Sequence, residues 1–241
     1  AQCFARRYPA RRSFQPLLSN NVPEEPLSEE VVRARSLARY CRRAATYDST
    51  CRPTWPIRER AVASLHLQPG QAVLDVACGT GLSLPLLRAA VGETGRVYGF
   101  DQSPAMLAQA FARSAAAGWR NVHLFETAAH ALTLPEAIDA LLFHYTHDIL
   151  RSPAAIDRLL ALARPGALVA IAGIKYFPGW LAPLNPWVYF KNRAYNGGPG
   201  ELASPWDRIA PRLTHWQWAP TQFGMGYLAS ARVAERSECA E

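Results

Sequence analysis

The chain has 241 residues, of which 49% are hydrophobic and 19% charged, as expected for one globular α/β domain with a small addition. The absence of any run of 18 apolar residues argues against a membrane-spanning helix. Most of the net charge of +7 belongs to residues 1–60, with 12 Arg and 6 acidic residues, so the nearly neutral remainder argues against a nucleic-acid partner.

The five cysteines indicate neither a disulfide framework nor a metal site, because they are odd in number, scattered and without a C-x-x-C pair. They are Cys3, Cys41, Cys51, Cys78 and Cys239. We therefore expect no metal and a reducing, cytoplasmic location. We further expect no membrane partner, and a monomer or a homodimer.

The N-terminal part, residues 1–30, is rich in Arg and Pro and shows no hydrophobic periodicity, which predicts a flexible extension. A transit peptide is the alternative interpretation, because the first 23 residues contain Arg and Ser but no acid. A helical pattern begins at Ser28, and we expect residues 31–56 to form a helical lid. The folded domain is predicted to span residues 31–241.

From residue 57 the hydrophobic pattern alternates between helix and strand with short connections, which predicts a mostly parallel sheet covered by helices on both faces. Helices are predicted at residues 57–67, 82–91, 104–117 and 153–163. Strands are predicted at residues 72–77, 96–100, 121–125, 138–143, 167–173, 213–218 and 224–233. The expected fold is α/β, a Rossmann-like doubly wound sheet of seven strands with an antiparallel last strand.

The pattern changes in residues 174–212, which contain six prolines and eight aromatic residues. This composition predicts a small aromatic-rich cap inserted ahead of the last two strands. Such a density of aromatic side chains favours an apolar or cationic small molecule in an enclosed pocket. Packing of the cap onto the domain is the alternative role for these aromatic residues.

The most informative motif is a strand that ends in an acid and opens into a glycine-rich turn, V-L-D-V-A-C-G-T-G at residues 73–81. A second acid, Asp101, ends another short apolar strand about 20 residues after this turn. Glycines let the backbone approach a nucleotide closely, and the later acid can bond ribose hydroxyls. No G-x-G-x-x-G is present, and Asp75 before the turn favours the ammonium of an amino acid over a pyrophosphate.

Together with G-F-D-Q-S-P-A-M-L at residues 99–107 and R-P-G-A-L-V-A-I-A at residues 164–172, this motif resembles the class I S-adenosylmethionine (SAM) dependent methyltransferases. The resemblance covers about residues 35–175 and implies SAM as cofactor. It implies that Asp75 holds the amino group and Asp101 the ribose hydroxyls. The implied cofactor residues are Tyr47, Asp75, Ala77, Gly79, Gly81, Asp101, Gln102, Met106, Ala128, Ala129 and His144.

Two positions depart from the pattern of this family. The first glycine of the turn is Ala77, which preserves the turn if its φ angle stays negative. The acid that members often place after the third strand, to bond the adenine amino group, is replaced by Ala128, and Glu126 lies two residues too early. We expect the backbone at Ala128 and Ala129 to make this contact. Met106 is expected to flank the adenine, and core packing is its alternative role.

The segment after the fourth predicted strand, H-Y-T-H-D at residues 144–148, is the densest cluster of titratable residues in the chain. His144 or His147 could deprotonate an acceptor, with Asp148 orienting one of them. Alternatively, His144 contacts the cofactor through its backbone and His147 begins a helix. The tyrosines Tyr47, Tyr145 and Tyr176 are candidates to face the sulfonium of SAM. The candidate catalytic residues are His144, Tyr145, His147 and Tyr176.

The resemblance implies an enzyme that transfers a methyl group from SAM to O, N or C of a small molecule, as in secondary metabolism. The first alternative is a SAM-consuming enzyme that releases methylthioadenosine, by cyclisation to azetidine-2-carboxylate or by aminocarboxypropyl transfer. A macromolecular methyltransferase is less favoured, because H-Y-T-H stands where base-modifying members carry N-P-P-Y-like residues. A non-catalytic SAM-binding module is disfavoured by the intact Asp75, Gly79, Gly81 and Asp101.

Overall fold

The computed structural model describes residues 46–192 and 199–235. The predicted extension 1–30, the helix predicted from Ser28 and most of the predicted lid 31–56 lie outside these residues. Within the described part of the chain, no helix is both long and apolar enough to cross a membrane. The same part contains no group of three or more His, Cys, Asp or Glu residues that could hold a metal ion.

Seven strands form one mixed sheet in the order β3-β2-β1-β4-β5-β7-β6, which confirms the predicted fold. Strands β1 to β5 pair in parallel, and β7 is antiparallel to both β5 and β6. Because β1 lies between β2 and β4, the carboxyl ends of these three strands meet at one edge. The bounds are β1 Ala72–Val76, β2 Arg96–Asp101, β3 Val122–Glu126, β4 Ile138–His144, β5 Ala163–Ile174, β6 Leu213–Thr221 and β7 Gly226–Val233.

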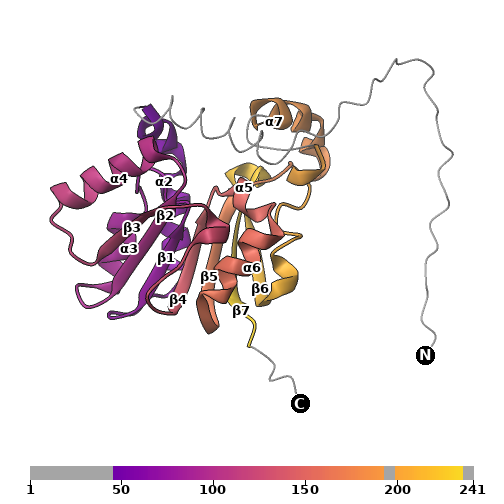
Figure 1. Cartoon of the computed structure of the whole chain (residues 1–241). Helices are drawn as coiled ribbons and strands as arrows, with labels where there is room; N and C mark the ends of the chain where they lie inside the picture. The colour runs from indigo at the N-terminus through magenta and orange to yellow at the C-terminus, as the bar shows by residue number, and fades with distance from the viewer. Residues whose placement is uncertain (1–45, 193–198, 236–241) are drawn as a thin grey trace, which may run out of the picture.

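Helices cover both faces of the sheet, and each face has its own buried core (Figure 1). On one face, α2, α3 and α4 pack against Val73, Val97 and Leu142. On the other face, α5 and α6 pack against Leu74 and Leu141. Consecutive strand residues thus face opposite cores, as expected when both sides of a sheet are buried. The helices are α2 Trp55–Ala63, α3 Leu84–Val91, α4 Pro104–Ala116, α5 His147–Leu150 and α6 Pro153–Ala161.

Strand β5 begins earlier than the sequence predicts. The Arg-Pro-Gly motif at residues 164–166, predicted to close the preceding helix, lies inside the strand instead. Ile138 of β4 pairs with Ala163, but Ala140 pairs with Leu168, so the intervening residues of β5 form a bulge. Gly166, with a φ angle of 75°, supplies the left-handed backbone that this bulge requires.

The described part of the segment between β5 and β6 forms a cap of short helices. Tyr176 N–H donates to the carbonyl of Leu202 at 2.8 Å, which joins the start of the cap to its middle. The Trp206 ring contacts Trp216 and Trp218 of β6, with ring centroids 6.1 and 4.9 Å apart. Main-chain and aromatic contacts therefore fasten the cap to the edge of the sheet. The helices are η3 Gly179–Leu184, α7 Asn185–Asn192, η4 Pro199–Leu202 and η5 Ala210–Arg212.

Candidate active site

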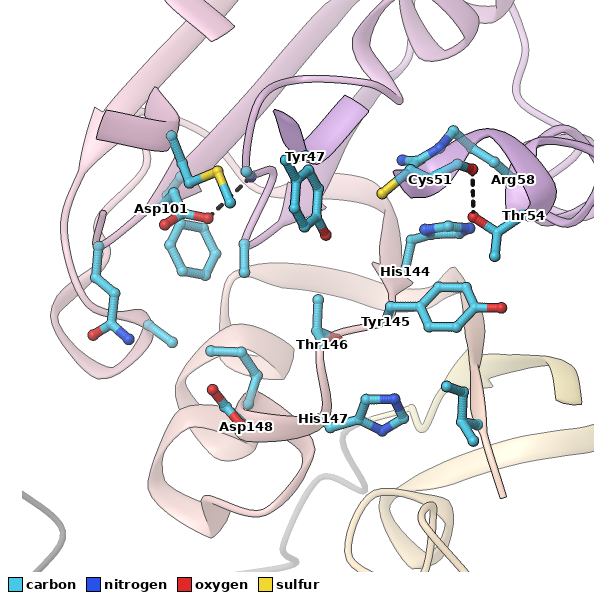
Figure 2. Close-up of a pocket in the computed structure, with 18 of the residues that line it drawn as sticks. Tyr47, Cys51, Thr54, Arg58, Asp101, His144, Tyr145, Thr146, His147 and Asp148 are labelled. Carbon is cyan, nitrogen blue, oxygen red and sulfur yellow. Dashed lines mark hydrogen bonds between the residues drawn. The ribbon is translucent and has the colours of Figure 1, made fainter. Parts of the chain in front are cut away.

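A pocket of about 270 Å³ opens at the carboxyl ends of β1, β2 and β4, where doubly wound sheets bind their ligands. Its first half is formed by the turn after β1 and the segment after β2. Its second half is formed by residues 50–54, the segment after β4 and part of the cap, and Arg58, which pairs with Asp75 behind the turn after β1, is counted with the first half. Figure 2 shows the Tyr47 ring between Asp101 of the first half and His144 and Tyr145 of the second.

Most of the site residues predicted from sequence come together in this pocket. Those that line it are Tyr47, Ala77, Gly79, Asp101, Gln102, Met106, Ala129, His144, Tyr145 and His147. The pocket lining formed by the described residues does not include four of the predicted residues, Asp75, Gly81, Ala128 and Tyr176. Asp75 is buried directly behind the turn, whereas Tyr176 lies at the start of the cap.

The turn after β1 has a left-handed backbone at Ala77 (φ 48°), Gly79 (φ 57°) and Gly81 (φ 77°). The expectation of a negative φ at Ala77 was wrong, and its Cβ adds strain that a glycine would avoid. A Cβ at Gly79 would meet no atom within 4 Å, so this position leaves open space beside the pocket. A Cβ at Gly81 would lie 2.6 Å from Leu84 Cδ1 and 3.0 Å from Ala110 Cβ, so Gly81 allows α3 and α4 to pack closely.

The Asp101 carboxylate is fixed by the backbone on both of its oxygens. The N–H of Gly79 donates to Oδ2 at 2.9 Å, and the N–H of Ser103 donates to Oδ1 at 2.8 Å. Burial raises the pKa of Asp101, and these hydrogen bonds oppose the rise. Each oxygen keeps a lone pair for a further donor, so the carboxylate can accept two hydroxyl groups in a fixed orientation.

Asp75 and Arg58 form a buried charged pair linked through Ser83. The Arg58 guanidinium donates to the Ser83 hydroxyl, which in turn bonds the Asp75 carboxylate. Burial raises the pKa of Asp75 to about 7, although the charge of Arg58 lowers it. Asp75 Oδ2 is buried and has no hydrogen-bond partner among the described residues. Because Arg58 lines the pocket, it presents a cation to a ligand, whereas Asp75 lies behind the lining.

Beyond Asp101 the pocket is lined by Gln102, Met106, Thr127 and Ala129. Thr127 N–H donates to the Asp101 carbonyl at 3.2 Å, which holds the segment after β3 against the end of β2. Met106 is fully buried and serves the protein core as well as the pocket wall. Thr127 was missed from sequence, because a threonine after a strand is common and carries no specific signal.

Residues 73–166 match a family described as a methyltransferase domain. These residues form a methyltransferase domain, and the chain is similar to the class I SAM-dependent methyltransferases. A 2-phytyl-1,4-naphtoquinone methyltransferase of Thermosynechococcus vestitus is 28% identical over 174 residues, covering 68% of this chain and 73% of that protein. A 2-phytyl-1,4-naphtoquinone methyltransferase of Trichormus variabilis is 34% identical over 119 residues. This match covers 47% of this chain and 51% of that protein, about half of its length.

A solved structure gives the same fold. The N-methyltransferase NodS from Bradyrhizobium japonicum WM9, in complex with S-adenosyl-L-homocysteine (SAH), superposes with a TM-score of 0.62. The match covers 83% of this chain and 100% of that chain at 17% identity. SAM is therefore the cofactor of the methyltransferases that this chain resembles, as the sequence predicted.

The first half of the pocket fits SAM on its own chemistry. An amino-acid tail carries a carboxylate, for which the Arg58 guanidinium in the lining is complementary, and an ammonium, which the charge of the Asp75 carboxylate buried behind the lining would favour. A ribose carries two neighbouring hydroxyls, which match the two held oxygens of Asp101. The open space at Gly79 allows a ligand to lie against the backbone of the turn.

The second half is built around a strained residue, Tyr145, whose φ angle is 59°. Its N–H donates to the carbonyl of Ala172 on β5 at 2.8 Å, and its hydroxyl donates to Gln222 Oε1 at 3.4 Å. Burial raises the pKa of Tyr145 to about 12, so the hydroxyl stays protonated and acts as a donor. Tyr145 therefore connects the pocket to the turn between β6 and β7.

Both histidines of the cluster are neutral near pH 7. Burial, and then the charge of Arg58, lowers the pKa of His144 well below its usual range. Burial lowers the pKa of His147 to about 4; Arg151 lowers it further, whereas Asp148 and Glu201 raise it. A group with so low a pKa accepts a proton weakly, since general bases work best near the operating pH.

His147 begins α5, as one sequence-based interpretation held, and Asp148 accepts a hydrogen bond from Arg151 at 2.6 Å. Arg151 also donates to Glu201 of η4 at 2.7 Å and so ties α5 to the cap. A Cβ at Gly173 would lie 3.0 Å from His147 Cε1 and 2.9 Å from the Tyr227 hydroxyl. The glycine therefore leaves room for the His147 and Tyr227 rings on one face of β5.

Arg58 is the main functional candidate that the sequence-based analysis missed. A signal was present, because Arg58 shares the buried face of α2 with Ala61 and Val62, at helical spacings of three and four residues. An arginine on an otherwise apolar helix face is rarely buried without a partner. That partner, Asp75, follows 17 positions later in the sequence, and the helix–strand packing that joins them could not be read from the pattern.

Proposed function

We propose that the chain transfers the methyl group of SAM to an O, N or C atom of a small, largely apolar molecule. The observation that carries this proposal is one continuous pocket that contains both Asp101, fixed by two backbone N–H groups, and the His144–Asp148 segment. The first half offers groups for the cofactor, and the second offers a separate space for an acceptor.

In this proposal Asp101 accepts both ribose hydroxyls, and Asp75 and Arg58 hold the ammonium and the carboxylate of the amino-acid tail. Gln102, Met106, Thr127 and Ala129 enclose the adenine. Bound SAM supplies an electrophilic methyl group on a positively charged sulfur. Tyr47, which lies between the two halves in Figure 2, is placed to present its ring to that charge.

The residues of the second half act mainly by positioning the acceptor and excluding water. Methyl transfer needs the acceptor atom in line at about 3–3.5 Å, and such alignment supplies a large share of the rate enhancement. The Tyr145 hydroxyl, which donates to Gln222, can still accept a hydrogen bond from the acceptor, and neutral His144 offers an unpaired Nε2 to one of its polar groups. Ile174 and Leu202 supply apolar walls.

Two observations support a small apolar acceptor. The pocket is closed on one side by the cap, through Asn192 and Leu202, which leaves room for a small molecule. The relatives that match the chain include quinone methyltransferases by name, whose substrates are ring compounds with apolar parts. An acceptor of this kind suits the aromatic and aliphatic side chains of the second half.

A second candidate reaction is cleavage of SAM at the γ-carbon, for which Asp75 is the specific observation. A buried carboxylate with a pKa of about 7 beside the amino group could take the proton that a nucleophilic amine must lose. Attack by that amine on the γ-carbon would break the carbon–sulfur bond and release methylthioadenosine.

The test is to incubate the purified full chain with SAM, first alone and then with a reduced alkyl-1,4-naphthoquinone, and to identify products by mass spectrometry. The proposal predicts intact SAM in the first incubation, and SAH with a methylated quinol in the second. Methylthioadenosine above the uncatalysed rate in the first incubation would favour the γ-carbon reaction. Absence of SAH with a panel of hydroxyl, amine and carbon acceptors would contradict methyl transfer.

A further inference from the structure

An unusual number of large apolar side chains are exposed beside the mouth of the pocket. Seven large hydrophobic residues of the described chain are strongly exposed, and five of them lie on the cap or on the turn between β6 and β7. We call these five the apolar rim: Trp180 (86% exposed), Leu184 (48%), Trp187 (53%), Phe190 (61%) and Phe223 (96%).

The cap contributes four of these residues on its outer side. Trp180 and Leu184 lie on η3, and Trp187 lies on α7, which follows η3 directly; all three side chains are exposed. Val188 of α7 is fully buried and faces the domain. The cap therefore turns large apolar side chains outward, opposite to the usual arrangement of a surface helix. Figure 1 shows α7 standing off the body of the sheet.

The turn between β6 and β7 adds Phe223 to the same surface. Gln222 and Phe223 both have a left-handed backbone, with φ angles of 49° and 55°. A Cβ at Gly224 would lie 3.0 Å from Pro178 Cδ, so this turn packs against the start of the cap. Holding a phenylalanine in this strained geometry, almost fully exposed, indicates a role outside the protein core.

The rim is also poor in negative charge. No acidic residue occurs in the sequence between Asp157 and Glu201, whereas Lys175 and Lys191 lie in this interval. Lys191 Nζ is exposed and lies 4.7 Å from the centre of the Trp187 ring, whereas Lys175 is buried and its Nζ donates to the carbonyl of Tyr176. A protruding tryptophan beside an exposed lysine suits the boundary of a membrane that contains anionic lipids.

We propose that the apolar rim docks on the surface of an anionic lipid bilayer, and that the acceptor enters the pocket from that bilayer. Docking by inserted side chains does not require a membrane-spanning helix. The described residues contain no helix of that kind. The inference replaces the sequence-based expectation that no membrane partner exists. Its second part, entry of the acceptor, rests on the proposed function, whereas docking itself does not.

The lipid surface is favoured over a protein partner by the combination of features on this face. The most exposed members, Trp180 and Phe223, stand out as separate side chains at a helix start and a turn tip, a form suited to insertion between lipids. The exposed Lys191, with no acidic residue near it in sequence, matches the negative charge of lipid headgroups. Asn192 and Leu202 line the pocket from the same cap, so a lipophilic molecule has only a short path from the bilayer.

The test is co-sedimentation of the full chain with vesicles, measured without any acceptor. One set of vesicles contains only phosphatidylcholine, and the other contains equal parts of phosphatidylcholine and phosphatidylglycerol. We expect stronger binding to the second set, and about a tenfold or greater loss in the double variant Trp180→Ser, Phe223→Ser. Phe111→Ser is the matched control, because Phe111 is 50% exposed on α4 away from the rim, and it should bind as the wild type does.

Equal sedimentation of the wild type and the double variant, or no sedimentation of the wild type, would overturn the proposal. Sedimentation velocity without vesicles identifies a competing occupant. A dimer that the double variant dissociates, without vesicle binding by the wild type, would assign the rim to a second copy. SAH affinity should be unchanged in the double variant, so failure of docking and failure of the proposed function are separable.

Discussion

The two halves of the pocket are held together in different ways. In the first half, the backbone fixes the key acid, since the N–H groups of Gly79 and Ser103 hold Asp101. In the second half, His144 Nε2 and Thr146 Oγ1 are buried and have no hydrogen-bond partner among the described residues, as is also true of Asp75 Oδ2 behind the first half. The site around Asp101 is thus preorganised by local turns, whereas we expect the second half to be completed when an acceptor supplies hydrogen bonds.

The largest effect is expected from removing the fixed acid of the first half. Asp101→Ala removes two charge-assisted hydrogen bonds, so SAH affinity should fall by about 100-fold or more, as measured by isothermal titration calorimetry. Glu136→Gln is the control, because Glu136 pairs with Arg96 at the opposite end of β2. Unchanged affinity in Asp101→Ala would refute the assignment of the ribose site.

Arg58→Met tests whether the first half extends to the amino-acid tail. We expect about a tenfold to 100-fold loss of SAH affinity, in the range of a lost charged hydrogen bond. Affinity for methylthioadenosine, which lacks the tail, should be unchanged. Arg60→Met is the control, because Arg60 is exposed on the same helix. An equal loss for both ligands would mean that Arg58 only supports the fold.

The raised pKa of Asp75 predicts opposite pH dependences for binding and stability. Below its pKa of about 7 the carboxyl is neutral and cannot pair with an ammonium, so SAH affinity should fall by about tenfold per pH unit. The free energy of unfolding without ligand should instead decrease as pH rises from about 4 to 7, because the unfolded chain ionises first. Asp75→Asn should remove the pH dependence of SAH affinity, measured by calorimetry, and that of the free energy of unfolding, measured by urea titration. If either pH dependence persists in this variant, Asp75 is not the group that causes it.

Variants of the two histidines test the second half. His144→Ala and His147→Ala should lower turnover by about tenfold and leave SAH affinity unchanged, because weak bases act mainly by positioning. Turnover of the wild type should show no histidine titration between pH 5.5 and 8, since the pKa of His147 is about 4 and that of His144 also lies well below its usual range. His123→Ala, on the exposed face of β3, is the control. Intact turnover in both variants would remove the histidines from the mechanism.

The smallest effect is expected at Ala77. Ala77→Gly relieves a left-handed backbone, at the expense of a more flexible unfolded chain, so we expect a net gain of about 0.5–1 kcal/mol in the free energy of unfolding. Urea denaturation measures this difference. A loss of stability would mean that the Ala77 side chain contributes packing that outweighs its strain.

The features that could be predicted from the sequence are those that depend on interactions between residues close to one another in the chain. The turn after β1 and the acid at Asp101 are specified by residues close to one another in sequence, and both were found. The seven strands and the mostly parallel sheet were predicted because each strand carries its own apolar pattern, whereas the order of the strands was not.

Features that depend on packing between distant elements were not predictable in this way. Arg58 meets Asp75 only because α2 packs across β1, and the bulge at Gly166 depends on pairing with β4. The positive φ of Ala77 is imposed by the turn against the preference of alanine. The outward-facing aromatics of the cap break the usual helical pattern, so composition alone indicated a cap but not which side of it was apolar.

The most direct test of the two-part pocket is a crystal structure of the full chain with SAH. The account predicts the ribose hydroxyls on Asp101, the amino-acid tail between Asp75 and Arg58, and the sulfur facing Tyr47 and His144. SAH bound elsewhere, or with its tail directed away from Arg58, would contradict the division of the pocket into a cofactor half and an acceptor half.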